Sequence, residues 1–316
     1  MKKYIFSSYA FSFIKEAKKI AEATGFQLVL GRYNPLSVAG KGLIIGNPDY
    51  VTKRIIDMTR RVEFKCYLVL EGILVNKSLL RYYNRFTIIV PSQFVRECFE
   101  ESGLHVDYVI PHAIPKVNPR PVKFREKARL LYIAWWHNFL PRKYPKEAIE
   151  ALKLVRYPFE LVILTSPNNP YISELRKYGI VMTDVGKLPE NELLKLYQSA
   201  DFYLSFSQSE GFGVPILEAI SVGLPVIHVD AKPFTEITTP ECSIRFPYDK
   251  VILHPCPNFK GKLHVYSAQE LANAINEALE IYYNDKAKYL EMCKAGIERA
   301  KAFTYPHTYK RFTEIV

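Results

Sequence analysis

Short apolar runs alternate with stretches of helical period along most of the chain. Apolar runs of four or five residues are typical of strands buried in a parallel sheet, and apolar positions three and four apart are typical of the helices between them. In the first part of the chain, this pattern predicts strands at residues 4–7, 27–30, 43–46, 67–70, 86–90 and 108–110, and helices at 12–23, 49–61 and 92–101.

The same pattern restarts after residue 127. It predicts strands at residues 130–134, 161–165, 181–185, 202–205 and 225–229, and helices at 146–155, 172–178, 190–199, 215–222, 268–284 and 287–302, with a last segment reaching residue 316. The fold class is therefore α/β, with strands and helices alternating as in βαβ units.

A proline-rich stretch separates the two series. Four prolines fall within residues 111–121, and proline continues neither a helix nor a central strand. We expect an N-terminal domain at 1–115, a linker at 116–127, a C-terminal domain at 128–302 and a closing segment at 303–316. Open α/β sheets bind ligands beyond the carboxyl ends of their strands, so two such domains facing each other would enclose a site.

Composition narrows the class of protein. The 316 residues are 48% hydrophobic and 24% charged, which excludes a disordered chain. No apolar run approaches the roughly 18–20 residues that cross a bilayer, so we expect a soluble, cytoplasmic protein. The net charge of +11 favours anionic partners such as nucleotide phosphates, nucleic acid or an anionic membrane surface, but its scatter along the sequence selects none of them.

The five cysteines are widely spread and form no C-x-x-C motif. This spacing argues against a disulfide framework and against structural zinc, and favours small buried thiols. The sequence also offers no D-x-D motif or histidine cluster, so we expect no metal site.

The most informative stretch is residues 200–220, which predict a strand, a turn and a helix. Gly211 and Gly213 permit positive φ in the turn, and Pro215 suits a first helical turn because its missing N–H costs nothing there. The helix N-terminus is a natural seat for an anion. Glu210 lies in the turn and Glu218 about one turn into the helix, so both can face one ligand.

With its flanks, this stretch resembles the retaining glycosyltransferases of family 4, which have the GT-B fold. The family's E-x7-E signature is similar to Glu210–Glu218 in SEGFGVPILEA, and the resemblance covers about 180–237. Weaker resemblances lie at 91–115 and 303–316. The resemblance implies two Rossmann-like βαβ domains facing across a cleft, with a C-terminal helix crossing back to the first domain.

The same resemblance implies roles for residues. Glu218 would hydrogen-bond the ribose of a nucleotide-sugar, and Glu210 would hold the sugar ring near its 3- and 4-hydroxyls. The turn that would help to bind the donor comprises Gly211, Phe212, Gly213 and Val214. The alternative is that Glu218 only complements the helix dipole and that Glu210 is a solvated turn residue.

Residues 133–145 form a second element that resembles the family. Lys143 matches a lysine that contacts the diphosphate, whereas His137 stands where the family has an arginine. Arg142 can substitute for that arginine, because its guanidinium binds two phosphate oxygens at once. The alternative is that Arg142 and Lys143 are solvated loop cations.

The first domain carries fewer signals. Glu71 follows the predicted strand 67–70 and is a candidate for orienting the acceptor. His112 is more compatible with shaping the hinge than with taking a proton. The glycine-rich loop of many relatives is absent after the first strand.

The resemblance implies a retaining hexosyltransferase that uses a UDP- or GDP-sugar and needs neither a metal nor a cofactor. The acceptor stays open among lipid, glycan, protein and nucleic acid. Peripheral contact with an anionic membrane is a further option, and no stable protein partner is expected. The alternatives are another GT-B enzyme, an epimerase or phosphorylase, and a non-catalytic basic protein that binds nucleic acid or a membrane.

Overall fold

The computed structural model describes residues 2–8, 10–30, 38–136 and 140–316. The chain folds into two compact units. The first unit comprises residues 1–115, 255–262 and 302–316, and the second comprises 116–254 and 263–301. Each unit is built around one parallel six-stranded sheet.

The sheet of the first unit has the strand order β2-β1-β3-β4-β6-β7, and all of its pairings are parallel. Its strands are β1 (Lys3–Ser7), β2 (Gln27–Val29), β3 (Gly40–Gly46), β4 (Val62–Leu68), β6 (Thr87–Val90) and β7 (Tyr108–Val109). Its long helices are α1 (Phe11–Thr24), α2 (Tyr50–Met58), α3 (Lys77–Tyr83) and α4 (Gln93–Glu101). Side chains of Asp49, Asn76 and Ser92 cap the N-termini of α2, α3 and α4.

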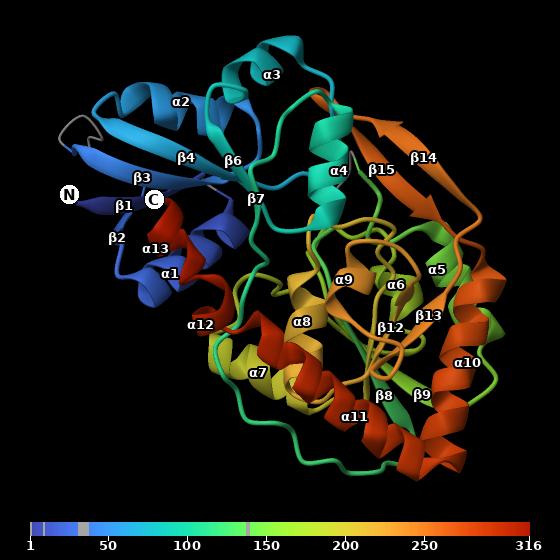
Figure 1. Cartoon of the computed structure of the whole chain (residues 1–316). Helices are drawn as coiled ribbons and strands as arrows, with labels where there is room; N and C mark the ends of the chain where they lie inside the picture. Colours follow the sequence, from blue (N-terminus) through green and yellow to red (C-terminus); the bar gives the residue numbers. More distant parts are fainter. Residues whose placement is uncertain (1, 9, 31–37, 137–139) are drawn as a thin grey trace. The chain divides into compact units, whose positions relative to one another are not determined.

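Two hydrophobic cores cover the two faces of this sheet. One core contains Ile56 of α2, Leu79 of α3 and Phe94 of α4, so these three helices share a face. The other core contains Ile20 of α1 together with Tyr309 and Phe312 of the C-terminal segment. That segment, α12 (Tyr305–Thr308) and α13 (Arg311–Ile315), thus completes the first unit from the far end of the chain (Figure 1).

A small three-stranded sheet, β14-β15-β5, had no counterpart in the sequence prediction. It joins β5 (Gly72–Leu74) with β14 (Lys250–Pro255) and β15 (Phe259–Val265). Gly72 pairs with Gly261, and a Cβ on Gly72 would lie only 2.0 Å from the carbonyl oxygen of Lys260. Only glycine permits this close backbone approach.

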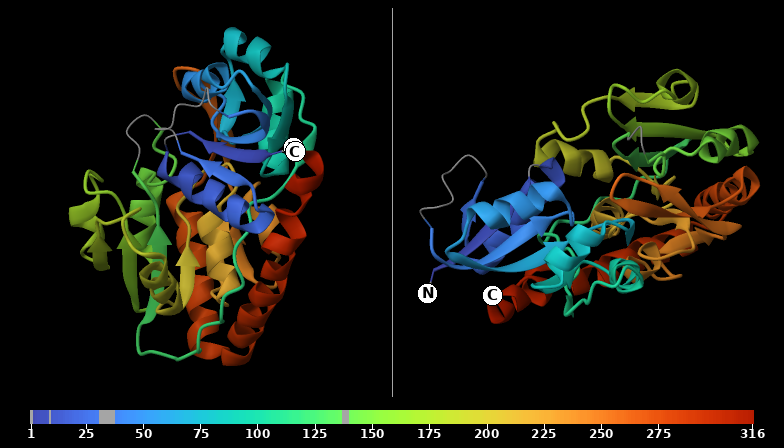
Figure 2. Two further views of the ribbon diagram at one scale, coloured as in Figure 1. Left: turned by 90° about the vertical axis from the view of Figure 1, so that its left-hand side faces the viewer. Right: turned by 90° about the horizontal axis from the view of Figure 1, so that it is seen from above.

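The sheet of the second unit has the order β10-β9-β8-β11-β12-β13, again with every pairing parallel. The strands are β8 (Ala128–Ile133), β9 (Phe159–Leu164), β10 (Gly179–Met182), β11 (Phe202–Leu204), β12 (Val226–Val229) and β13 (Ser243–Phe246). The helices are α5 (Lys146–Ala151), α6 (Ile172–Leu175), α7 (Glu190–Gln198), α8 (Val214–Ser221), α9 (Phe234–Ile237), α10 (Ala268–Asn284) and α11 (Lys286–Ala300). Helices α8 and α11 pack side by side (Figures 1 and 2).

The predicted α/β class and the alternation of elements are confirmed, and the main differences are at element ends. The predicted helix 49–61 ends at Met58, and only the first two residues of the predicted strand 67–70 belong to β4, which begins at Val62 and ends at Leu68. The predicted helix 146–155 tightens to a 3₁₀ turn after Ala151. The short elements β5, α3, α9, β13, β14 and β15 were not predicted.

We predict that Phe312→Ala lowers the free energy of unfolding by about 3–5 kcal/mol, because it empties a fully buried site between α1 and β4. Urea unfolding of the full chain measures this loss. Glu314→Ala, an exposed position on the same helix, is the control and should change stability by less than about 0.5 kcal/mol. Equal effects of the two substitutions would contradict the packing role of the C-terminal segment.

Candidate active site

The candidate site lies at the carboxyl ends of β8 and β11 in the second unit. These two strands are neighbours at the point where the strand order reverses direction, with β9 and β10 on one side and β12 and β13 on the other. The loops that follow β8 and β11 leave the sheet in opposite directions at such a point, and the crevice between them is where open α/β sheets bind ligands. Arg142 and Lys143 lie in the first loop and Glu210 in the second.

These three charged side chains contact one another directly. Arg142 Nη1 lies 2.9 Å from Glu210 Oε2, and Lys143 Nζ lies 3.0 Å from Glu210 Oε1. The side chains are only 7%, 16% and 14% exposed for Arg142, Lys143 and Glu210, so water screens the pairs weakly. Arg142 is therefore not a solvated loop cation, and Glu210 is not a solvated turn residue.

The environment of Glu210 keeps its carboxylate ionised. Burial alone would raise the pKa of this carboxyl, but the charges of Arg142 and Lys143 and their hydrogen bonds outweigh burial and lower the pKa to about 2. The site thus holds two cations and one permanent anion at neutral pH.

Backbone and hydroxyl contacts fix this cluster. Arg142 Nη1 also donates to the carbonyl of Ser209 at 2.8 Å, and the N–H of Gln208 donates to the carbonyl of Arg142 at 2.8 Å. Ser207 Oγ donates to Glu210 Oε1 at 3.1 Å and lies 3.1 Å from the hydroxyl of Tyr132. The Tyr132 hydroxyl in turn donates to the Lys143 carbonyl at 2.6 Å. Each loop is therefore bound to the other through both main chain and side chains.

The helix after the second loop carries the other glutamate. Gly213 caps α8 with φ of 106°, a left-handed conformation that any other residue would adopt with strain, and Pro215 stands in the first turn. Glu218 lies half-buried on α8 and accepts a hydrogen bond of 2.8 Å from the hydroxyl of Tyr197 on α7. Burial first, and then the charge of Glu218, hold the pKa of Tyr197 well above its usual value, so this phenol stays a donor.

The remaining predicted site residues lie in different places. Gly211 and Phe212 are buried in the turn, and Val214 begins α8. His137 lies outside the described residues. Glu71 belongs to the first unit, where its carbonyl accepts the N–H of Lys262. The roles assigned to all of these residues stay predictions.

His112 also lies in the first unit, in a buried group of polar side chains. Its Nδ1 is 3.0 Å from Glu16 Oε1 and 3.0 Å from the hydroxyl of Tyr67. Tyr67 in turn donates to the carbonyl of Ile110. This arrangement ties His112 to the end of the first unit's sheet through Tyr67, and the expected part of His112 in shaping the hinge stays a prediction.

Sequence reasoning missed Tyr132, Ser207 and Tyr197. Tyr132 sits in a strand of apolar residues and reads as core, and Ser207 precedes the signature glutamate without a motif of its own. Tyr197 gave a usable signal, since it lies on the amphipathic helix before β11 and reaches the neighbouring α8. The periodicity of hydrophobic positions within one βα unit does not show which side chains of different units contact each other.

The described residues contain no group of three or more His, Cys, Asp or Glu side chains that could hold a metal ion. Within the described ranges, no helix is both long and apolar enough to span a membrane. Of the five cysteines, Cys256 is partly exposed and the others are buried thiols.

Comparison with known proteins shows what the chain is similar to. Residues 119–246 match the family model for glycosyl transferases group 1. The chain is 29% identical over 231 residues to putative glycosyltransferase 48 of a Sulfolobus islandicus filamentous virus, covering 71% of this chain and 68% of that relative.

Several solved structures share the fold. The structure of Anabaena HepE in complex with UDP and glucose matches with a TM-score of 0.68 at 14% identity, over 100% of this chain and 99% of that one. TarM matches with a TM-score of 0.62 at 14% identity, over 87% of this chain and 54% of that one. The predicted GT-B fold class and the resemblance to family 4 are thereby confirmed.

We predict that the Glu210 ion pairs stabilise the second unit in a pH-dependent way. A carboxyl whose folded pKa is lowered contributes stability above its unfolded pKa of about 4.5 and loses it as the pH falls toward about 2. The difference in unfolding free energy between wild type and Glu210→Gln should be on the order of 2–3 kcal/mol at pH 7 and shrink between pH 4.5 and 2. Urea unfolding across this range measures it, and a difference independent of pH would contradict the assignment.

Proposed function

We propose that this protein transfers a hexose from a nucleotide-diphosphate sugar to an acceptor with retention of configuration. The observation that carries the proposal is the buried cluster of Glu210 with Arg142 and Lys143, beside the N-terminus of α8 and at the strand reversal of the sheet. The two cations and the helix N-terminus support binding of a diphosphate here, and the carboxylate supports contact with sugar hydroxyls.

Glu218 is assigned to the ribose of the donor. Its carboxylate is already aligned by Tyr197 and is half-buried rather than sealed in the core, so an oxygen can accept from a diol. UDP is the first nucleotide to test, because the similar HepE structure contains UDP and glucose. GDP is the second.

Arg142 and Lys143 are assigned different tasks. Arg142 is the more buried of the two and donates to both the Glu210 carboxylate and the Ser209 carbonyl, which supports a role in holding Glu210. Lys143 is more exposed and has a flexible ammonium with three donors, which supports a role in binding the diphosphate. This division refines the expectation that both cations contact phosphate.

The proposed reaction needs no residue to act as nucleophile. The bond between the sugar C1 and the diphosphate oxygen breaks, and the bond from C1 to the acceptor oxygen forms on the same face. The acceptor proton goes to the departing phosphate oxygen. Negative charge grows on the diphosphate as it leaves, so a fixed cation at Lys143 stabilises the transition state more than the bound substrate.

We predict that Glu218→Ala and Glu210→Ala affect different steps. Glu218→Ala should raise the Kd for UDP, because ribose contacts exist before and during the reaction. Glu210→Ala should mainly lower the rate of donor turnover, because this carboxylate contacts the moving sugar. Calorimetry with UDP and a donor-hydrolysis assay separate the two quantities, and Glu192→Ala, an exposed position on α7, is the control. Wild-type turnover in both site variants would overturn the assignment.

We predict that Lys143→Ala lowers donor turnover by roughly 10²–10³, the scale observed when one oriented charge stabiliser is removed. Lys146→Ala, three residues further along and 77% exposed, should leave turnover unchanged. Turnover of wild type should also persist in EDTA. Activity that disappears in EDTA and returns with Mn²⁺ would contradict the metal-free reaction.

A further inference from the structure

Helices α2 and α3 carry an unusual density of positive charge on the first unit. Residues 49–61 and 77–85 contain only two carboxylates, Asp49 and Asp57. Against these stand seven cations, which we call the α2–α3 basic face: Lys53, Arg54, Arg60, Arg61, Lys77, Arg81 and Arg85. Six of the seven are exposed, and Lys53 is partly exposed.

The two carboxylates already have partners. Asp49 caps α2 by accepting from the N–H of Thr52, and Asp57 pairs with Lys53 and accepts from the hydroxyl of Tyr82. The excess of positive charge on this face is therefore not neutralised by its own acids.

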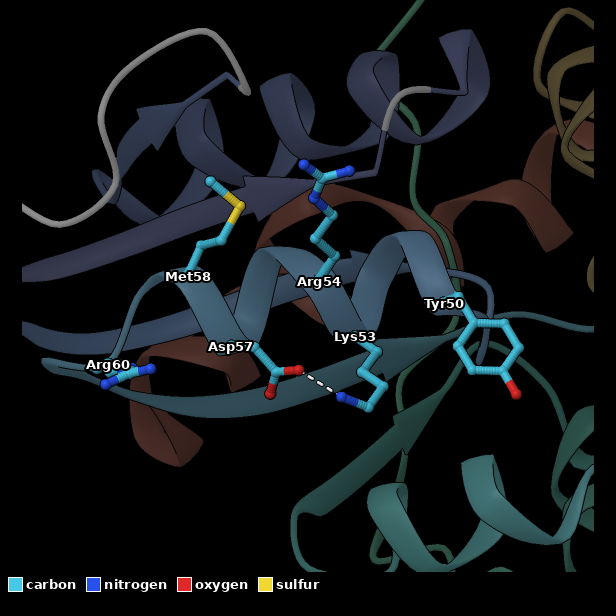
Figure 3. Close-up of a pocket in the computed structure, with 6 residues that line it drawn as sticks. All are labelled: Tyr50, Lys53, Arg54, Asp57, Met58 and Arg60. Atoms are coloured by element: carbon cyan, nitrogen blue, oxygen red, sulfur yellow. Dashed lines mark hydrogen bonds and ion pairs between the residues drawn. The ribbon is translucent and has the colours of Figure 1, made fainter.

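Apolar side chains are also exposed on α2. Tyr50, Val51 and Met58 are 53%, 42% and 43% exposed. Val51, Arg54 and Met58 are three and four residues apart, so they follow one line along α2. Figure 3 shows Arg54 and Met58 projecting to the same side of the helix, while the Lys53–Asp57 pair points to the other. The opposite side of α2 is buried through Ile56 and Thr52.

We propose that the α2–α3 basic face docks on an anionic lipid surface. Phosphate headgroups would bind the arginines and lysines, and Val51 and Met58, on one line with Arg54, would enter the boundary between headgroups and acyl chains. A nucleic acid would satisfy the cations but would leave Val51 and Met58 exposed, so a lipid surface fits both parts of the face. The proposal stands independently of the sugar-transfer proposal.

The size of the expected effect follows from the charge. Each cation held near an anionic bilayer surface increases partitioning by about fivefold, and salt screens this attraction within a Debye length. The full chain should therefore sediment with vesicles containing phosphatidylglycerol at low salt, remain in solution with pure phosphatidylcholine vesicles, and be released by about 0.5 M NaCl.

Two double variants with the same change in net charge locate the docking surface. Arg54→Glu with Arg61→Glu should reduce partitioning onto phosphatidylglycerol vesicles by at least about 100-fold. Lys288→Glu with Lys294→Glu places the same charge change on the exposed side of α11 in the second unit and should reduce partitioning much less. Equal losses in the two variants would show attraction by net charge alone and overturn the proposal.

A charge-neutral pair tests the apolar part. Val51→Ser with Met58→Ser should weaken binding to the same vesicles several-fold, with an unchanged circular dichroism spectrum and unchanged UDP affinity. Unchanged partitioning of this pair would overturn the assignment to lipid. Tight binding to duplex DNA together with no binding to phosphatidylglycerol vesicles would overturn it in favour of a nucleic acid.

Discussion

The site of this protein depends on one buried anion held by two cations. Removing Glu210 from water is costly, and only the close approach of Arg142 and Lys143 makes the ionised carboxylate stable there. The pairing requires that the loop after β8 and the loop after β11 meet. The ion pairs of the site therefore form only when the second unit is packed as observed. Loss of Glu210 leaves two cations without their anion in a place with little water, whereas loss of either cation leaves Glu210 with one partner.

The fold supplies this meeting point. The strand order is β10-β9-β8-β11-β12-β13, so the chain adds strands outward from β8 on one side and then outward from β11 on the other. The loops that follow β8 and β11 therefore have no covering helix between them. Gly213 then turns the second loop into α8 with a left-handed residue, so this helix begins only four residues after Glu210. Strand order, turn geometry and charge placement thus meet in the loops that follow β8 and β11.

The parts of this architecture that depend on local pattern could be predicted from sequence. The long helices, the buried parallel strands and the Glu210–Glu218 spacing all leave signals within one βα unit. The short strand β5 and the hairpin of β14 and β15 do not, because β14 is exposed along most of its length and β5 has only three residues. The ion pairs were also beyond prediction, since Arg142 and Glu210 are far apart in the sequence and their partnership depends on which strands are neighbours.

Strand order also explains why the net charge pointed to no particular surface when only the sequence was considered. Lys53, Arg54, Arg60 and Arg61 belong to one crossover, whereas Lys77, Arg81 and Arg85 belong to another, separated by β4 and β5. Because β3, β4 and β6 are neighbours and their connections have one hand, α2 and α3 must cover the same face of the sheet, as their shared core confirms. Cations that are scattered in the sequence therefore belong to two crossovers that cover one face of the sheet, on α2 and α3 and in the turns that follow them.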